Sequence, residues 1–440
     1  MRILHLAYED PAQPGSGGGS IRTREINRRL AERHEITAIV SGYPGARARS
    51  EDGVRWVPIG LRSANIFLNR LSYFALLGRA IRRHPHDLLV EDFGAPFSAG
   101  FAPLFTSKPV VASVQWLFAR EKSAEYHLPF HWVEQAGLPL YDDFIAVSDW
   151  LAATLRARRP RATVTVIPNG VDDVAFGVDP APPRHLLFVG RLEIEQKGGD
   201  LLLDSVAQAR ALLGASTPPL IIAGTGPDRE AMERQVRRLG LDDVVQFHGH
   251  VEGVDKYRLM ASAYAVLMPS RWESFGLVAV ESMAAGAPLI AFDVGPLRDV
   301  VGPNNARLVP PFDTARYARE IVATVRDADA LGALRRSGRE WARRYNWDHL
   351  AAQQEDHYLA SVARAAPRGR LTPTRPVFPP SAPNPGTSWS AEAPGPEAPG
   401  PEAPGPEAPG PEAPGPEAPG PEAPGPEAPG PEAPGPEARR

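Results

Sequence analysis

The strongest constraint on the fold of this chain is a regular alternation of short apolar runs with stretches of helical periodicity. Such alternation is typical of βαβ units, in which the strands form a parallel sheet and the helices cover its faces. A first series of expected strands comprises residues 2–8, 35–40, 88–90, 110–114, 144–147 and 164–167. A second series comprises residues 185–189, 220–223, 244–247, 265–268 and 289–292. The sequence therefore predicts an α/β protein with two similar parallel sheets.

A proline-rich stretch, DPAPPR at positions 179–184, separates the two series. It can continue neither a strand nor a helix, so we expect a domain boundary near residues 170–184. A chain of 440 residues is long enough for two domains, at ~100–200 residues each. After the second series, we expect one or two helices over residues 314–345 and another over residues 347–365.

The end of the chain has a different composition. Pro, Gly, Ser and Thr dominate from residue 367 onward, and the pentapeptide EAPGP is repeated nine times over residues 392–436. A segment with so little apolar bulk cannot offset an ordering entropy of ~1–2 kcal/mol per residue. We therefore expect residues 367–440 to be a disordered tail. It would act as a solvated spacer or, alternatively, as an acidic docking tail for a basic partner.

Composition also excludes several classes of function. The chain has no Cys, which rules out disulfide frameworks, thiolate metal sites and cysteine nucleophiles. Outside residues 391–440, 46 basic and 42 acidic residues nearly balance, so we expect no nucleic-acid partner. No apolar run approaches the ~18 residues of a membrane span, and the N-terminal sequence MRILHLAYED lacks the features of a secretory signal. The expected location is cytoplasmic.

A first candidate ligand loop is GSGGGS at positions 15–20, between the strand expected at 2–8 and a helix expected at 21–33. Glycine lets a backbone approach a ligand closely, and the N–H groups of the following helix N-terminus attract an anion. The spacing differs from the dinucleotide fingerprint G-x-G-x-x-G. A flexible loop tip is the alternative interpretation.

A second candidate is GRLEIEQKGG at positions 190–199, directly after the strand expected at 185–189. Arg191 at the carboxyl end of a parallel strand and Lys197 six residues later can converge on one phosphate group. The guanidinium fork and the ammonium point charge together can hold a diphosphate. Ligands of open α/β sheets bind at this edge. Otherwise, both residues are solvated loop charges.

A third candidate is RWESFGLVAVE at positions 271–281. Glu273 follows the strand expected at 265–268, and residues 276–285 are expected to form a helix. Three backbone N–H groups suited to a phosphate or sugar oxygen then lie at the helix N-terminus, those of Phe275, Gly276 and Leu277. Glu281 lies inside this helix in an apolar stretch that predicts burial, where hydroxyl groups of a sugar or ribose would supply hydrogen-bond donors. An exposed helix Glu is the alternative.

The second and third motifs, with ESFGLVAVESMAAG at positions 273–286, resemble those of the family 4 retaining glycosyltransferases of GT-B fold. Further matching segments are AVS at 146–148, VIPNGVD at 166–172 and AGTGP at 223–227. The likeness covers residues 1–365 in the same order, and the tail has no counterpart in it. The resemblance implies two Rossmann-like domains that face a central cleft. They would be an acceptor domain (1–172) and a donor domain (173–345), followed by a helix (346–366) that crosses back to the first.

The resemblance also implies roles for individual residues. Arg191 and Lys197 would neutralise the leaving diphosphate, and Glu273 would bind hydroxyl groups of the donor sugar, so these three are the expected catalytic residues. The donor would also be bound by Gly18, Gly19, Phe275, Gly276, Leu277 and Glu281. In this set, Glu281 would hold the nucleotide ribose.

The chain departs from the family pattern at one position. In many members the strand matching residues 110–114 ends in a His that contacts the donor sugar, and here Gln115 follows that strand. Gln115 can donate and accept hydrogen bonds but cannot become cationic. It is the candidate sugar contact, and His127 and His131 are alternative replacements for the missing His. For each of them, a surface or core His is the other interpretation.

Neither a metal ion nor a cofactor is expected besides the nucleotide-diphosphate sugar itself. An Asp-x-Asp motif could hold a divalent cation, and the sequence has one, Asp327–Asp329. It lies in an expected helical stretch far from any strand end, so we expect it to form part of a solvated helix face. No carboxylate can be assigned as a nucleophile for double displacement. The resemblance implies a front-face reaction, in which the leaving phosphate assists deprotonation of the acceptor and the anomeric configuration is retained.

The predicted function is transfer of a sugar from a nucleotide-diphosphate sugar to an unidentified hydroxyl acceptor, which is a glycan, a lipid-linked molecule or a small molecule. A nucleotide-sugar 2-epimerase of related fold is one alternative. A non-catalytic scaffold that uses its tail is another.

Residues 64–83 form an amphipathic stretch that allows two interpretations. Its apolar positions Phe67, Leu68, Leu71, Phe74 and Leu77 lie opposite Arg70, Arg79, Arg82 and Arg83. This pattern fits a helix that packs on the core. It also fits peripheral attachment to an anionic membrane, at the inner face of the cell membrane.

Overall fold

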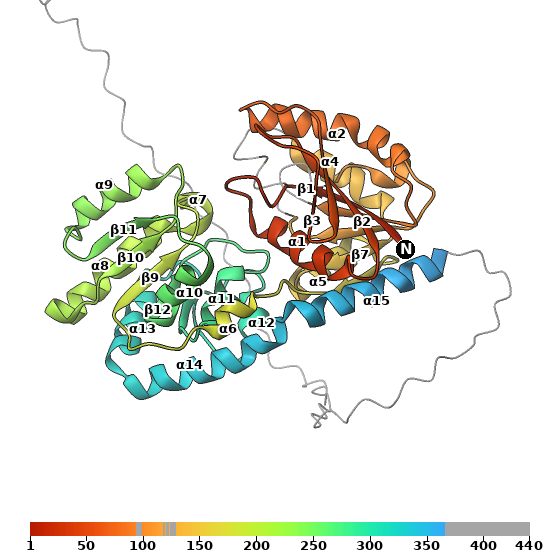
Figure 1. Cartoon of the computed structure of the whole chain (residues 1–440). Helices are drawn as coiled ribbons and strands as arrows, with labels where there is room; N and C mark the ends of the chain where they lie inside the picture. Colours follow the sequence, from red (N-terminus) through yellow and green to blue (C-terminus); the bar gives the residue numbers. More distant parts are fainter. Residues whose placement is uncertain (94–98, 118, 120–122, 124–128, 366–440) are drawn as a thin grey trace, which may run out of the picture. The chain divides into compact units, whose positions relative to one another are not determined.

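The computed structural model describes residues 1–93, 99–117, 119, 123 and 129–365 (Figure 1). The described residues form two Rossmann-like α/β layers within one compact unit, Met1–Arg370. The predictions for residues 367–440 and for His127 lie outside the described residues. The division of the chain at residue 172 stays a prediction.

Within the described residues, the first sheet has eight strands in the order β3-β4-β2-β1-β5-β6-β7-β8. They are β1 (Arg2–Tyr8), β2 (Glu35–Ser41), β3 (Arg49–Glu51), β4 (Val54–Ile59), β5 (Leu88–Phe93), β6 (Val110–Val114), β7 (Asp143–Ala146) and β8 (Thr163–Val166). All neighbours pair in parallel except β3 and β4, which are antiparallel. The strand order reverses at β1, which lies between β2 and β5.

The second sheet has six strands in the described part of the chain, in the order β11-β10-β9-β12-β13-β14. They are β9 (His185–Val189), β10 (Leu220–Ala223), β11 (Val245–Gly249), β12 (Ala263–Met268), β13 (Leu289–Phe292) and β14 (Arg307–Val309). All pairs are parallel. This is the order of doubly wound nucleotide-binding sheets, and it reverses between β9 and β12. The strands are apolar along their length because helices cover both faces, and Leu186 and Ile290 are fully buried.

The longer helices of the first half are α1 (Gly18–Leu30), α2 (Ile66–Arg83), α4 (Phe130–Gly137) and α5 (Asp149–Arg158). In the second half they are α8 (Gly199–Leu213), α9 (Arg229–Leu239), α10 (Gly253–Ala261), α11 (Leu277–Ala284), α13 (Thr314–Arg326), α14 (Ala328–Ala342) and α15 (Trp347–Ala365). Short helices are α6 (Asp173–Gly177), α7 (Ile194–Lys197) and α12 (Leu297–Val301). The predicted bounds of β1, β6, β9, β10, β13 and α15 are confirmed.

The structure corrects two sequence predictions and adds three strands. Helix α1 begins at Gly18 instead of residue 21, so part of the glycine loop forms its first turn. Strands β3, β4 and β14 were not predicted. Asp327 does not lie on a helix face: it separates α13 from α14, and its side chain accepts a hydrogen bond from the Ala330 N–H at 2.8 Å, as an N-cap does.

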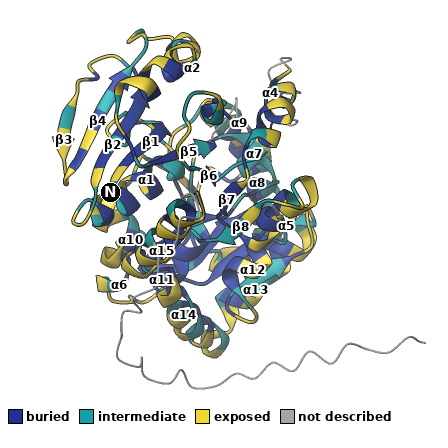
Figure 2. Cartoon of the chain, turned by 90° about the vertical axis from the view of Figure 1, so that its right-hand side faces the viewer, coloured by how far each residue is buried: buried dark blue, intermediate teal, exposed yellow. Residues whose placement is uncertain are grey.

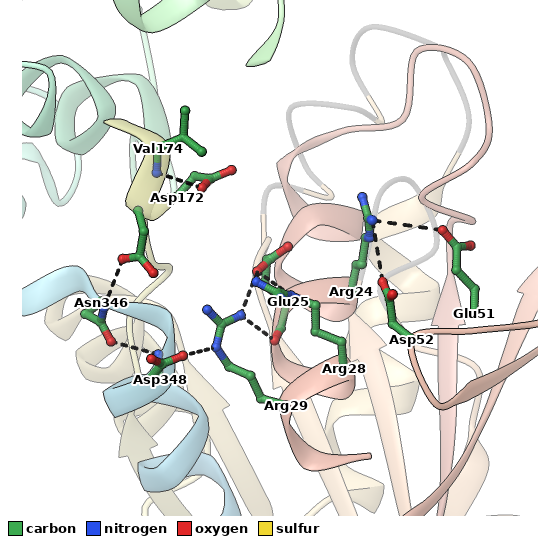
Figure 3. A network of polar contacts seen from close by, with 11 residues as sticks. Arg24, Glu25, Arg28, Arg29, Glu51, Asp52, Asp172, Val174, Asn346 and Asp348 are labelled. Atoms are coloured by element: carbon green, nitrogen blue, oxygen red, sulfur yellow. Dashed lines mark hydrogen bonds and ion pairs between the residues drawn. The ribbon is translucent and has the colours of Figure 1, made fainter. Parts of the chain in front are cut away.

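Helix α15 follows the second sheet in sequence but packs on the first layer. Its residues Trp347, Leu350 and Tyr358 belong to the same buried cluster as β1, β2 and β5. Polar contacts join it to α1 as well: the Arg29 guanidinium contacts the Asp348 carboxylate at 2.5 Å and also pairs with Glu25 (Figure 3).

The most buried of these contacts belongs to Arg22 of α1, which is 2% exposed. Its guanidinium donates to the Pro168 carbonyl at 2.6 Å, to Asn169 Oδ1 at 3.1 Å and to Gln354 Oε1 at 2.6 Å. One side chain thus joins α1, α15 and the segment that leaves the first sheet. Beside it, Val171 and Asn346 form a parallel β-bridge.

Helix α2 is only partly covered. Tyr73, Leu77 and Ile81 are buried, whereas Ile66, Phe67, Leu68 and Leu71 in its first half are between 44% and 53% exposed. Figure 2 shows this as yellow on α2 against the dark blue of the sheet strands. The predicted stripe therefore splits: Leu77 packs on the core and Phe74 is half-buried. Among the described residues, no helix combines the length and apolarity needed to span a bilayer.

Candidate active site

The predicted ligand loops lie at the points where the strand orders reverse. The glycine loop follows β1, the GRLEIEQKGG segment follows β9, and Glu273 follows β12. In doubly wound sheets, neighbouring loops diverge to opposite faces at such a point and leave a crevice at the carboxyl ends of the strands. The topology therefore brings the second and third motifs together at the reversal between β9 and β12.

At this reversal, Lys197 and Glu273 form an ion pair. Lys197 is the last residue of α7, and its Nζ donates to Glu273 Oε1 at 2.7 Å. Ser270 Oγ donates to the same oxygen at 2.8 Å. Glu273 is 6% exposed, and a buried carboxylate needs such partners because desolvation opposes its charge. Two residues that the sequence predicted to act together are thus in direct contact.

Glu281 is buried on α11, as its apolar surroundings predict. Its Oε1 accepts a hydrogen bond at 2.8 Å from Nζ of Lys256, which lies on α10. Sequence reasoning did not assign Lys256 to the site. The available signal is its rarity: the chain has four Lys, against 44 Arg, and two of the four pair with the two glutamates of the third motif.

The N-terminus of α11 is shaped by Gly276. This residue has φ +91°, which favours glycine, and a Cβ there would lie 2.6 Å from Leu297 Cδ2. Phe275 anchors the turn: its ring is buried and meets Tyr345 edge to face at 5.7 Å between ring centroids. The first residue of α11 is Leu277, and no described side chain caps the helix.

The glycine loop packs against this helix start and against Gln115. A Cβ on Gly18 would overlap the Leu277 side chain, and a Cβ on Gly19 would lie 3.4 Å from the Gln115 amide. Gln115 Nε2 donates to the Gly19 carbonyl at 3.4 Å. Gly18, Gly19, Gln115 and Leu277 are therefore neighbours, although they come from three separate parts of the sequence. A contact across the two layers supports the same arrangement: Ser148 Oγ donates to the Ser274 carbonyl at 3.2 Å.

Two predicted site residues, Arg191 and His131, make their contacts elsewhere than at the Lys197–Glu273 pair. Arg191 follows β9, but its guanidinium is 62% exposed and pairs with Glu193 at 3.0 Å, outside the Lys197–Glu273 pair. His131 lies on α4, where its Nδ1 is 3.0 Å from Ser123 Oγ. Convergence of Arg191 on a diphosphate and replacement of the family's His by His131 stay predictions. In the described ranges, no group of three or more His, Asp and Glu side chains is arranged to hold a metal ion.

Comparison with known proteins agrees with this geometry. Residues 16–174 match the family model "Glycosyltransferase Family 4", and residues 183–327 match "Glycosyl transferases group 1". Glycogen synthase of Mycobacterium tuberculosis (strain ATCC 25618 / H37Rv) is 31% identical over 206 residues, 46% of this chain and 49% of that protein. Phosphatidyl-myo-inositol mannosyltransferase of Mycobacterium leprae is 34% identical over 217 residues, 48% of this chain and 56% of that protein. The chain thus spans about half the length of the curated relatives it matches.

Solved structures show the same fold at lower sequence identity. Sucrose-phosphate synthase from Thermosynechococcus elongatus superposes with a TM-score of 0.70 at 22% identity, over 82% of this chain and 99% of that chain. Anabaena Alr3699/HepE in complex with UDP has a TM-score of 0.61 at 19% identity, over 82% of this chain and 100% of that chain. The resemblance stated from the sequence motifs is confirmed: with two layers of GT-B architecture and a family match on each, the chain belongs to the family 4 glycosyltransferases, group 1.

Proposed function

We propose that this protein transfers a sugar from a nucleotide-diphosphate sugar to a hydroxyl acceptor, with retention of the anomeric configuration and without a metal ion. The observation that carries the proposal is the Lys197–Glu273 ion pair at the strand reversal, with the α11 N-terminus and the glycine loop beside it. Two further observations support it: a structural neighbour was solved with UDP, and curated relatives are named as sugar-transferring enzymes.

In the proposed reaction, the bond between the sugar C1 and the phosphate oxygen breaks while the acceptor oxygen bonds to C1 on the same face. The acceptor proton passes to the leaving phosphate, and the nucleoside diphosphate departs. Negative charge builds on the diphosphate, so fixed positive charge and N–H groups aimed at it are the main catalytic resource. Lys197, Arg191 and the backbone amides of residues 275–277 would supply them, with Gly18 and Gly19 opposite.

The two glutamates would orient the donor. Glu273 would accept hydrogen bonds from sugar hydroxyl groups on the side that Lys197 and Ser270 leave open, and Glu281 would hold the ribose hydroxyl groups. Gln115, next to Gly19, would contact the donor sugar as a neutral partner. Because Gln115 cannot carry a positive charge, Lys197, Arg191 and the backbone amides of residues 275–277 would stabilise the leaving diphosphate without help from this position.

The test is a thermal-shift screen against UDP-, GDP-, ADP- and dTDP-sugars, with and without EDTA. A donor at ~100 times its Kd adds about 2.7 kcal/mol of stability. We expect one nucleotide class to stabilise the wild type equally with and without EDTA, and Lys197→Met to abolish the shift. Lys108→Met, at an exposed lysine away from the site, is the matched control. Absence of any shift, or loss of the shift with EDTA, would contradict the proposal.

Product analysis separates the proposed transferase from its alternatives. A transferase forms glycoside only with an acceptor, and NMR of the product gives its anomeric configuration. A 2-epimerase would change the nucleotide sugar without any acceptor, and a non-catalytic scaffold would leave it intact.

We infer further that the first layer contacts an anionic membrane, which favours a lipid-linked acceptor. The exposed apolar residues Ile66, Phe67, Leu68 and Leu71 of α2 are joined by Leu61, which is 53% exposed. Residues 60–86 contain five Arg and no Asp or Glu; Arg70 pairs with Glu9 at 3.0 Å, and the other four give this segment its net positive charge. Apolar area combined with positive charge favours the interface of anionic lipids.

Sedimentation with vesicles tests this contact. We expect binding to phosphatidylglycerol vesicles but not to phosphatidylcholine vesicles, and its loss in the double variant Phe67→Ser/Leu71→Ser. Leu359→Ser removes an equally exposed leucine, at 49%, from α15 and should bind as the wild type does. Equal binding by both variants would refute the assignment.

A further inference from the structure

We propose that Arg271 is a positioning residue that, together with Asp200, fixes the loop carrying Lys197 against the loop carrying Glu273. The consequence for activity rests on the proposed function, whereas the consequence for the geometry of the ion pair does not. Arg271 belongs to the third motif but has no role in the mechanism above.

The contacts of Arg271 all reach across from the β12–α11 loop to the loop after β9. Its Nη1 and Nη2 donate to Asp200 Oδ1 at 2.9 Å and Oδ2 at 2.6 Å, a bidentate pair with the first turn of α8. Nη1 also donates to the Ile194 carbonyl at 2.6 Å, and the Arg271 backbone N–H donates to the Gln196 carbonyl at 2.8 Å. A single residue therefore holds α7 at both of its ends.

Lys197 lies inside this set of contacts. It follows Gln196 directly, and it precedes Gly198, which has φ +67° and leaves no room for a Cβ beside the Pro269 carbonyl. Glu273 lies two residues after Arg271, and its own carbonyl is backed by Gly295, where a Cβ would lie 2.6 Å away. The backbone beside Lys197 is thus held by the β12–α11 loop, and the backbone of Glu273 also packs against a third segment, between β13 and α12.

The charge of Arg271 is balanced within the protein. Side chains of Arg271 and Asp200 are 27% and 29% exposed. Burial is the largest single effect and opposes ionisation of Asp200, but the hydrogen bonds and the positive charge of Arg271, with two backbone N–H groups, together hold the pKa of this carboxyl below its usual range. Lys197 and Arg191 also have carboxylate partners, but Arg271 differs from them because its guanidinium makes two hydrogen bonds to Asp200 and a third to the Ile194 carbonyl.

The same molecule offers a matched control. Arg210 on α8 makes an equivalent bidentate pair with Asp243, at 2.6 and 2.8 Å, and also donates to a backbone carbonyl, that of Gly240, at 2.7 Å. Neither Arg210 nor Asp243 belongs to the loops of the site. Arg210→Met therefore removes an interaction of the same kind without touching α7.

The first experiment observes the ion pair directly and needs no substrate. With lysine-selective ¹⁵N labelling, the chain has only four lysine side-chain ammonium groups, and Lys197→Arg identifies the signal of Lys197. We expect this signal to shift and broaden in Arg271→Met and in Asp200→Asn, and to stay in place in Arg210→Met. An unchanged Lys197 signal in Arg271→Met would overturn the proposal, whatever the protein's activity.

The second experiment measures hydrolysis of the nucleotide sugar identified by the thermal-shift screen. We expect Arg271→Met and Asp200→Asn each to lower kcat at least tenfold with less than a threefold change in KM, because misplaced charge costs the transition state more than the ground state. The double variant Arg271→Met/Asp200→Asn should have the same kcat as Arg271→Met, since both single substitutions remove the same Arg271–Asp200 contact. Arg271→Lys should have a higher kcat than Arg271→Met, and Arg210→Met should have the kcat and KM of the wild type.

Two results would refute the positioning role. If Arg271→Met weakens nucleoside diphosphate binding tenfold while Asp200→Asn binds like the wild type, Arg271 is a direct phosphate ligand. If Arg271→Met and Arg210→Met lose the same thermal stability and neither changes kcat, the Arg271–Asp200 pair supports only the fold. If the wild type does not hydrolyse the nucleotide sugar, the lysine spectrum decides the positioning role, and the thermal-shift screen and the product analysis decide the proposed function separately.

Discussion

The Lys197–Glu273 ion pair allows stability and activity to be separated by two substitutions. Lys197→Met leaves the Glu273 carboxylate, which is 6% exposed, with Ser270 as its one remaining hydrogen-bond partner among the residues that the structure describes. Removal of one partner from a buried ion pair costs roughly 3–5 kcal/mol. Since Lys197 itself is 21% exposed, water can reach part of the site, and we expect a loss of about 3 kcal/mol. The double variant Lys197→Met/Glu273→Gln removes the uncompensated charge and should recover most of this loss.

The measurement is calorimetric unfolding of the two variants, the wild type and Lys108→Met. At about 2.1 cal/mol/K of unfolding entropy per residue, a loss of 3 kcal/mol in one compact unit of this size lowers the Tm by about 4 °C. We expect Lys197→Met to melt about 4 °C below the wild type, the double variant to melt within about 1 °C of the wild type, and neither variant to bind a nucleotide sugar. Equal Tm values for the two variants would show that Glu273 is not held as a buried charge, and the reasoning about the pair would fail.

Three further outcomes follow from the described contacts. Burial raises the pKa of Glu91 to about 7 despite its hydrogen bond from Tyr141. The neutral Glu91 carboxyl therefore contributes fully to the free energy of unfolding below about pH 4.5, and this contribution is lost as pH rises through 7. Glu91→Gln should reduce the loss of unfolding free energy between pH 4.5 and pH 8 by about 3 kcal/mol in urea titrations, and an unchanged pH profile would contradict this. Gly18→Val should weaken nucleotide binding at least tenfold by calorimetric titration because its side chain meets Leu277, whereas Gly17→Ala, whose Cβ would lie 3.5 Å from Glu9, should bind normally. Arg22→Met should lower the free energy of unfolding by about 3 kcal/mol because it leaves buried acceptors without a donor. Arg33→Met removes an exposed guanidinium that pairs with Glu355 at the same helix interface and should change the free energy of unfolding little. Similar losses in the two variants would contradict the importance of the buried Arg22 contacts.

Much of the fold could be predicted because buried parallel strands are nearly continuous apolar runs. Strands β1, β9 and β13 have the expected bounds for this reason. The short β3 contains no apolar residue and could not be found that way. Its hairpin did leave a local signal, however: Asp52 and Gly53 both have positive φ, as a tight Asp-Gly turn requires.

The start of α1 could not be predicted from local preference. A run of glycines disfavours a helix, yet Gly18 and Gly19 form the first turn of α1. A Cβ on Gly18 would overlap the Leu277 side chain, so the reason for glycine at this position is a tertiary contact that appears in no sequence window.

The site residues show a similar limit. Motif spacing placed Lys197 and Glu273 after the ends of strands, and the apolar stretch around Glu281 predicted its burial. Their partners depend on which elements pack together: Lys256 reaches Glu281 from α10, and Arg271 reaches Asp200 from the other loop. Spacing along the chain carries no information on such pairs.

The position of α15 has a practical consequence for anyone who would divide this protein. A fragment that stops after the second sheet keeps the whole first layer in sequence but loses Trp347, Leu350 and Tyr358 from its interior. It would also leave the Arg22 guanidinium without Gln354 and expose the flank of α1 to water. Independent production of the first layer therefore requires a copy of residues 346–365, supplied either through a linker or as a separate peptide.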